Sequence, residues 1–159
     1  MAKVYLICGK ICVGKTTYAE KIRREKSAVL LSTDEITLAL FPEGVGEKHD
    51  LYVERTQEYL LEKSLEIVEI GINVVLDWGF WMKEERDFAR DFYASRGVGC
   101  EFHYIDVSDE EWYRRLEKRN AAVTNGEVSA YFVDEGLAEK FGAIFEPPTA
   151  DEIDVWINC

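Results

Sequence analysis

The chain has 159 residues, enough for one domain with a sizeable hydrophobic core and too few for a second large domain. Hydrophobic residues make up 47% and charged residues 31%, and no apolar run approaches the roughly 20 residues that a membrane span needs. The formal net charge of −12 disfavours long nucleic acids, whose phosphates are bound mainly by Lys and Arg. We therefore expect a cytoplasmic protein of one domain, a monomer or homodimer, with neither membrane nor long nucleic acid as its partner.

The first apolar run, residues 4–8, leads directly into a glycine-bearing loop. Apolar and polar residues do not alternate in this run, which is typical of a parallel strand buried on both faces. Residues 9–16 then fit the phosphate-binding pattern G-x-x-x-x-G-K-[ST] at every fixed position. This P-loop pattern predicts that Lys15 binds the β- and γ-phosphates of a nucleotide and that the Thr16 hydroxyl coordinates Mg²⁺. The residues expected to bind the nucleotide here are Gly9, Lys10, Cys12, Val13, Gly14, Lys15, Thr16 and Thr17.

The four cysteines show no spacing typical of a metal site, and a cytoplasmic chain keeps them reduced. Cys12 stands out because it lies in the P-loop, close to Lys15 and to a helix N-terminus. We interpret it as a small residue that fits the loop. A redox-sensitive thiol is the alternative.

A helix is predicted over residues 16–26 and a second apolar strand over residues 28–31, which ends in Ser32-Thr33-Asp34. Because the carboxyl ends of strands in open α/β sheets face the ligand crevice, Asp34 should lie on the same rim as the P-loop. Asp34 as a helix N-cap, worth about 1 kcal/mol, is one interpretation. We favour the other, in which its carboxylate orients and deprotonates an attacking hydroxyl.

Residues 41–46 predict a mobile loop, and a long helical pattern follows from Asp50 to Gly71. The third strand, residues 72–77, is again apolar and ends in Asp77. An apolar run closing on Asp beside a P-loop resembles the Walker B arrangement, in which the carboxylate holds Mg²⁺ directly or through water. Asp77 is therefore predicted to share the metal with Thr16, with a turn or capping role as the alternative.

Three large aromatic residues follow this strand on the expected rim. They either close the core or line a substrate pocket, and the two interpretations weigh equally. With Phe41, His49 and Tyr52 they would form an apolar cup for an organic molecule bearing a hydroxyl. Arg86, in a predicted helix over residues 83–96, is either solvated or turned to the rim as a substrate or phosphate clamp. The candidate substrate-binding residues are Asp34, Tyr52, Trp78, Phe80, Trp81 and Arg86.

The second half of the chain begins with a strand over residues 99–106, in which His103 is interpreted as a packed histidine. A helix follows from Ser108, and Arg115 and Arg119 share one of its faces. They are the best candidates to cover the γ-phosphate, although basic residues near a helix C-terminus also complement its dipole. The remaining expectations are a short flap over residues 120–133, a helix over 134–145 and a fifth strand over 153–157, with a lid at approximately 114–133.

Taken together, the motifs GKICVGKTT, STDEI, VVLDWGF, RRLEKRN and FEPPTADE resemble the small P-loop kinases of the nucleoside-monophosphate-kinase-like superfamily. The group includes short AAA-domain ATP-binding proteins, chloramphenicol phosphotransferase, gluconate kinase and zeta-toxin-like kinases. The resemblance implies a three-layer α/β fold with a five-stranded parallel sheet of order 2-3-1-4-5. It also implies a catalytic role for Asp34, lid roles for Arg115 and Arg119, and a place beside the adenine for Pro147.

Two departures from the family pattern bear on function. Lys10 and Cys12 differ from the common loop residues, which leaves phosphate binding intact. An arginine shortly after the catalytic Asp of some zeta-toxin-like kinases is absent after Asp34, which weakens a nucleotide-sugar interpretation.

The leading hypothesis is an ATP- and Mg²⁺-dependent kinase for a hydroxyl-bearing small molecule, with Lys15, Asp34, Arg115 and Arg119 as catalytic residues. A nucleoside, nucleotide or polynucleotide-end kinase is a second enzymatic interpretation. The third is a nucleotide-dependent switch or ATPase without an acceptor. The sequence leaves open the acceptor itself and the choice between ATP and GTP.

Overall fold

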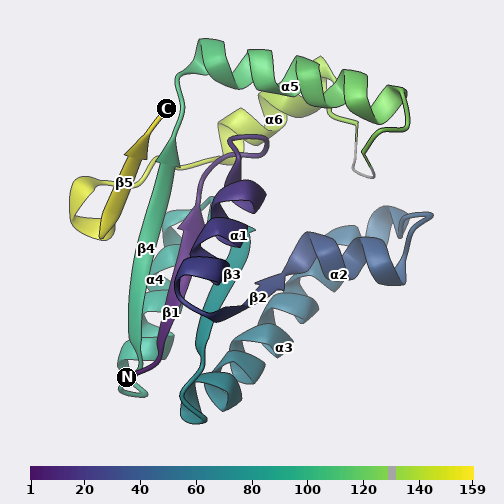
Figure 1. The fold of residues 1–159 in the computed structure, drawn as a ribbon. Coiled ribbons are helices and arrows are strands. Elements are labelled where there is room, and N and C mark those ends of the chain that lie inside the picture. Colours follow the sequence, from purple (N-terminus) through teal and green to yellow (C-terminus); the bar gives the residue numbers. More distant parts are fainter. Residues whose placement is uncertain (129–131) are drawn as a thin grey trace.

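The computed structural model describes residues 1–128 and 132–159, and its centre is a five-stranded parallel sheet between two layers of helices (Figure 1). The strand order β2-β3-β1-β4-β5 puts the strand that enters the P-loop in the middle. Both the predicted α/β class and the predicted strand order are confirmed. The strands are β1 (Lys3–Cys8), β2 (Ala28–Ser32), β3 (Asn73–Gly79), β4 (Gly99–Asp106) and β5 (Val155–Asn158).

Helices cover both faces of the sheet because alternate residues of each central strand are buried on opposite sides. On one face Leu6 packs in a cluster with Leu61 and Phe92, and on the other Ile7 packs with Ile22. The helices are α1 (Lys15–Glu25), α2 (Thr33–Leu40), α3 (His49–Glu69), α4 (Lys83–Ala94), α5 (Asp109–Thr124) and α6 (Glu135–Ile144). Two short 3₁₀ turns are η1 (Gly46–Lys48) and η2 (Ala150–Glu152).

The register of the strands brings their carboxyl ends to one edge. Ile7 in β1 lies opposite Asp77 in β3, and Asp77 lies opposite Ser32 in β2. The P-loop, Asp77 and the start of α2 therefore share the rim, as the sequence predicts.

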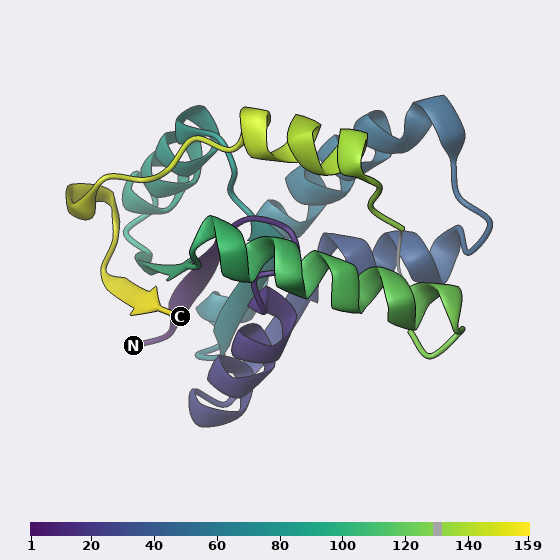
Figure 2. The ribbon, with the colours of Figure 1, turned by 90° about the horizontal axis from the view of Figure 1, so that it is seen from above.

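Helices α5 and α6 cross above this rim (Figure 1). Seen from above, they extend on either side of the P-loop (Figure 2). Asn120 in α5 accepts a hydrogen bond from the amide of Val133 at 2.8 Å and donates one to its carbonyl oxygen. These bonds fasten α5 to the segment that enters α6.

Three local predictions need correction. Ser32, not Asp34, caps α2, because its hydroxyl accepts from the amide of Glu35. The flap expected from residue 120 is wrong at its start, since α5 continues to Thr124. The fifth strand starts at Val155 rather than 153. Of the predicted lid, 114–124 is helical, and 129–131 lies outside the described residues.

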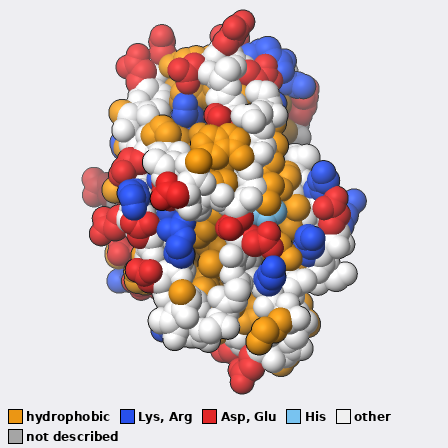
Figure 3. All heavy atoms as spheres, turned by 90° about the vertical axis from the view of Figure 1, so that its left-hand side faces the viewer, with side chains coloured by type: hydrophobic (Ala, Val, Ile, Leu, Met, Phe, Trp, Pro, Cys, Tyr) orange, Lys and Arg blue, Asp and Glu red, His pale blue; other side chains and the backbone are white. Residues whose placement is uncertain are grey.

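On the face that carries β5, Lys and Arg side chains lie interspersed with Asp and Glu instead of forming one continuous basic patch (Figure 3). Such a surface lacks the concentrated positive charge that phosphate backbones attract. Within the described residues, no helix combines the length and the apolar character required to cross a membrane.

Candidate active site

The P-loop occupies the turn between the end of β1 and Lys15, the first residue of α1. Two glycines make its path possible. A Cβ atom on Gly9 would lie 2.8 Å from Cγ2 of Val13 and 3.3 Å from the carbonyl oxygen of Ile105. Gly14 has a φ of 94°, in the left-handed region that favours glycine. The loop can therefore pack closely against Ile105 and fold back on itself. Its amides and the start of α1 together form a cradle for an anion.

Lys15 folds back over this cradle. Its ammonium donates a hydrogen bond to the carbonyl oxygen of Lys10 at 2.7 Å. Burial lowers the pKa of Lys15, while the carboxylates of Asp77 and Asp34 act in the opposite direction. Both predicted acidic groups thus lie within electrostatic reach of Lys15.

Thr16 and Asp77 form the candidate metal site. The Thr16 hydroxyl donates to Oδ2 of Asp77 at 3.3 Å, and Asp77 is only 6% exposed. Burial raises the pKa of Asp77, opposed by the charge of Lys15. The described residues contain no group of three or more His, Cys, Asp or Glu able to hold a metal. Mg²⁺ commonly takes one or two protein oxygens and completes its shell with phosphate oxygens and water, so this pair fits Mg²⁺.

Asp34 lies in the first turn of α2 with an exposed side chain. Because Ser32 caps the helix, the N-cap interpretation of Asp34 is wrong. Its charge helps to raise the pKa of Asp77 and opposes the lowering of the pKa of Lys15, so the carboxylate lies within electrostatic reach of both groups. An exposed carboxylate here is available to an incoming molecule.

Two arginines of α5 reach the P-loop from above. Arg115 donates from Nη1 to the carbonyl oxygen of Val13 at 2.7 Å and from Nε to Oε1 of Glu111 at 2.8 Å. Arg119 donates from Nη1 to the sulfur of Cys12. Hydrogen bonds from Arg114 and Arg115 lower the pKa of Glu111 to about 2, so this carboxylate stays charged and orients Arg115. The shared face that the sequence predicts is therefore directed at the loop.

The predicted aromatic residues divide between the two interpretations. The strand β3 continues to Gly79, so Trp78 lies within it rather than after it. Phe80 is 2% exposed and packs edge-on against Phe102 in the core, so its predicted substrate contact is wrong. Trp81 is half-buried and donates its indole N–H to the carbonyl oxygen of Gly9 at 3.1 Å. Trp78 is half-buried next to Asp77, and Tyr52 stacks on Phe41 with ring centroids 5.3 Å apart. Trp78 and Tyr52 remain predicted substrate residues.

Arg86 fits neither of its predicted roles. It is 1% exposed and forms an ion pair with Glu152, with 3.0 Å between Nε and Oε1. Its Nη1 atom donates to the carbonyl oxygens of Phe80 at 2.9 Å and Trp81 at 3.3 Å. Arg86 is thus a buried link between the segment after β3 and η2, and little of it is left to touch solvent or substrate.

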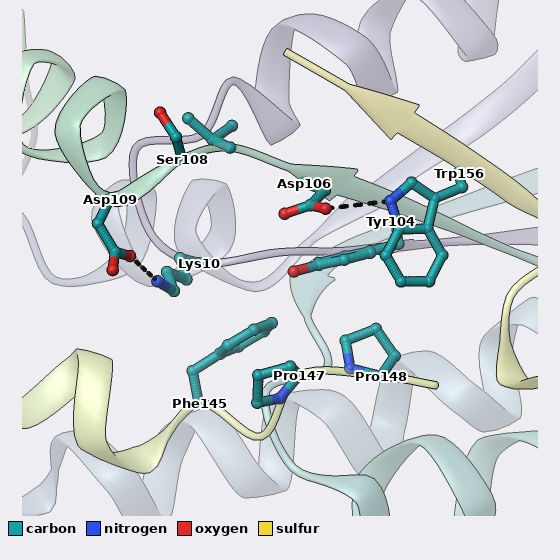
Figure 4. Close-up of a pocket in the computed structure, with 10 residues that line it drawn as sticks. Lys10, Tyr104, Asp106, Ser108, Asp109, Phe145, Pro147, Pro148 and Trp156 are labelled. Atoms are coloured by element: carbon teal, nitrogen blue, oxygen red, sulfur yellow. Dashed lines mark hydrogen bonds and ion pairs between the residues drawn. The ribbon is translucent and has the colours of Figure 1, made fainter. Parts of the chain in front are cut away.

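A cavity of about 350 Å³ opens beside the P-loop, at the ends of β4 and β5 (Figure 4). Lys10 lies at its mouth, paired with Asp109 at 3.1 Å and 4.6 Å from the ring centroid of Trp112. Asp106 accepts from the indole of Trp156 at 3.1 Å on the opposite wall. The lining residues are Lys10, Tyr104, Asp106, Val107, Ser108, Asp109, Phe145, Pro147, Pro148 and Trp156. A cavity lined by aromatic and proline side chains together with charged and polar groups, next to an anion cradle, suits a flat heterocycle.

The AAA domain family matches residues 4–148, which is most of the chain. The chain belongs to this AAA-domain family. A search of curated proteins finds no match for it.

Solved structures share the fold of this AAA-domain protein at low sequence identity. They include a sugar kinase from Janibacter sp. HTCC2649 (17% identity, 99% of this chain and 86% of that one, TM-score 0.68). The APS kinase of Mycobacterium tuberculosis in complex with AMPPNP and APS is 18% identical, and the match covers 99% of this chain and 88% of that one with a TM-score of 0.69. A gluconokinase from Sinorhizobium meliloti 1021 is 16% identical, and the match covers 98% of this chain and 82% of that one with a TM-score of 0.70. The predicted resemblance to small P-loop kinases is confirmed at the level of the fold.

Sequence reasoning found only part of the cavity in this AAA-domain protein. It named Lys10 and the segment from Phe145 to Pro148 but not Tyr104, Asp106 or Trp156. The signal was present, since Tyr104 and Asp106 are two residues apart at the carboxyl end of β4 and so share one face of the strand. What the sequence lacked was the pairing of β5 with β4, which places Trp156 opposite Tyr104.

Proposed function

We propose that this AAA-domain protein is an ATP-dependent kinase that transfers the γ-phosphoryl group to a hydroxyl of a small molecule. The observation that carries the proposal is the position of Lys15, the Thr16–Asp77 pair and the exposed carboxylate of Asp34 at one edge of the sheet. A P-loop and metal pair alone suit any nucleotide hydrolase. An additional free carboxylate beside them suits a reaction in which an alcohol loses its proton.

The proposed chemistry assigns each side chain one task. The acceptor hydroxyl oxygen attacks the γ-phosphorus, its proton passes to Asp34, and the bond from that phosphorus to the β,γ-bridging oxygen breaks to release ADP. Lys15, Arg115 and Arg119 neutralise the charge on the transferred group, an effect that for one arginine reaches on the order of 10³ to 10⁵ in rate. Thr16 and Asp77 would hold Mg²⁺, which when bound neutralises the β- and γ-oxygens.

The cavity beside Lys10 is the proposed site of the nucleotide base. It adjoins the P-loop through Lys10, and Phe145 and Pro147 form one of its walls. The wall comes from the segment that the family resemblance places beside the adenine. The acceptor would enter from the other side, past Asp34 and Trp78. The kinases of a sugar, of APS and of gluconate whose structures share this fold support a small-molecule acceptor.

The test compares wild type with Asp34→Asn. We expect the variant to bind Mg²⁺-ATP with unchanged affinity in calorimetry, because Asp34 is absent from the nucleotide cradle. Transfer should fall by about 10²- to 10⁴-fold, the contribution typical of a general base. Acceptors are found by incubating wild type with ATP and a library of sugars, alcohols and nucleosides, followed by mass spectrometry for a phosphate adduct.

The outcomes separate the alternatives. A phosphorylated nucleoside or nucleotide would favour the nucleoside kinase, and steady ATP hydrolysis with no phosphorylated product would favour the switch or ATPase. Retained transfer in Asp34→Asn would remove Asp34 from the mechanism.

A further inference from the structure

Side-chain donors hold four of the five carbonyl oxygens between Gly9 and Val13. Lys15 binds the carbonyl of Lys10, and Arg115 binds that of Val13. The other two donors are tryptophans. Trp81 binds the carbonyl of Gly9 at 3.1 Å, and Trp112 binds that of Ile11 at 2.6 Å.

The direction of these carbonyls decides the direction of the loop amides. A peptide unit is planar and trans, so the C=O of one residue and the N–H of the next point in opposite directions. A donor bound to the carbonyl oxygen of Gly9 therefore fixes the direction of the N–H of Lys10. A donor bound to the carbonyl oxygen of Ile11 fixes the direction of the N–H of Cys12 in the same way. Amides that already face the anion before it binds need no reorganisation when it arrives.

The two indoles differ from the other donors in their charge. Lys15 and Arg115 are cations assigned to the phosphates themselves, so they are free to leave the loop carbonyls when a nucleotide binds. An indole N–H is a neutral donor, so a phosphate on the other side of the loop does not attract it as it attracts a cation. The indole can therefore keep its hydrogen bond to the loop carbonyl when phosphate binds. Trp81 and Trp112 are therefore suited to hold the loop in both states.

Each indole is fixed by its own surroundings. Trp112 is 3% exposed, in α5. Trp81 packs against Phe141 in α6 with ring centroids 5.1 Å apart, and its carbonyl oxygen accepts from the amide of Glu146 at 2.8 Å. Gly79 leaves room for it, since a Cβ there would lie 2.6 Å from the indole nitrogen. The loop is thus held from two sides, by the segment after β3 and by α5.

We propose that Trp81 and Trp112 are positioning residues for phosphate binding, which hold the P-loop carbonyls outward so that the loop amides face the anion. The proposal rests on the nucleotide site of the proposed function, but not on any acceptor or on Asp34. It gives the aromatic residue Trp81 a role on the donor side of the reaction.

The test measures phosphate affinity without a base or an acceptor. Wild type, Trp81→Phe, Trp112→Phe and the double variant are titrated with inorganic tripolyphosphate and Mg²⁺ in a calorimeter. Each single change removes one hydrogen bond and should raise Kd about three- to tenfold, and the double change should raise it further. Tyr93→Phe is the matched control, because it removes one buried hydrogen bond, to Ser64 at 2.7 Å, away from the loop. Tyr93→Phe should lower the melting temperature but leave Kd unchanged.

Each result decides the question. Wild type that binds neither tripolyphosphate nor Mg²⁺-ATP would overturn the proposed function itself. Wild type that binds, with both tryptophan variants within about twofold of it, would overturn only the positioning role. If a phenylalanine variant fails to fold, benzothienylalanine is incorporated at the same position. This isostere keeps the ring and lacks the N–H, so an unchanged Kd there would also overturn the role.

Discussion

Arg119 in α5 donates a hydrogen bond from Nη1 to the sulfur of Cys12 in the P-loop, at 2.7 Å. The thiol therefore lies between the loop and an arginine proposed to cover the γ-phosphate. A group added to this sulfur would displace the guanidinium of Arg119 from the loop.

Alkylation of Cys12 with iodoacetamide should therefore weaken Mg²⁺-ATP binding about tenfold or more, since atoms forced into a packed site cost about 1–3 kcal/mol. Calorimetry after modification, with the site verified by mass spectrometry, measures the effect. Cys12→Ser should resist the treatment, whereas Cys159→Ser, which removes an exposed thiol, should not. Unchanged affinity after complete modification of Cys12 would contradict the prediction.

Replacement of Asp77 by Asn should raise the Mg²⁺ concentration needed for half-maximal activity, by about tenfold or more. The amide keeps the size of the carboxylate but not its charge, and the charge attracts the cation. Activity measured against Mg²⁺ at saturating ATP gives the answer. Affinity for nucleotide without metal should change little, and a wild-type Mg²⁺ profile would assign the metal elsewhere.

Arg86→Met should lower the free energy of unfolding by about 3–5 kcal/mol, because it leaves Glu152 buried without its partner. Urea denaturation measures the loss. The double variant Arg86→Met with Glu152→Leu should recover part of it, since no buried charge then remains unpaired. Equal stability of wild type and the single variant would show that the ion pair is dispensable.

His103 should make the protein less stable in mild acid. It is 4% exposed, and its Nδ1 atom lies 2.7 Å from the hydroxyl of Tyr18. Burial lowers its pKa below the usual 6.5, against the opposing charge of Glu101. The unfolded chain then binds more protons than the folded one, so stability is present above about pH 6.5 and is lost as the pH falls through the folded pKa.

Urea denaturation at several values between pH 7.5 and pH 5 tests this, on a scale set by the unperturbed histidine pKa of about 6.5. The decline in unfolding free energy should be smaller in His103→Gln. An identical decline in both proteins would assign the acid sensitivity to other groups.

The sequence predicts that Lys15, Thr16, Asp77 and two arginines of α5 lie together, because the signals for them are local. The P-loop pattern, Asp77 at the end of an apolar run and the spacing of Arg115 and Arg119 all depend on a few neighbouring residues. Parallel strands then bring these pieces to one edge, so a correct strand order is sufficient to group them.

The roles of Phe80, Trp81 and Arg86 could not be predicted in the same way, because each depends on a distant partner. Arg86 appears on an amphipathic helix among charged neighbours, and only Glu152, 66 residues away, explains its burial. Trp81 reaches Gly9, 72 residues earlier, through an indole whose direction no local pattern encodes. The sequence places these aromatic residues near the end of β3, but their partners decide which of them remain available to a ligand.

The bond from the Glu146 amide to the Trp81 carbonyl has a consequence for binding strength. One end of Trp81 is joined to the phosphate cradle and the other to the residue preceding Pro147, so the spacing between cradle and base cavity is set in advance. A nucleotide with the matching length then gains a chelate effect, in which anchoring of its phosphates raises the local concentration of its base. Tripolyphosphate and a free nucleoside together should bind far more weakly than the same parts joined in one molecule.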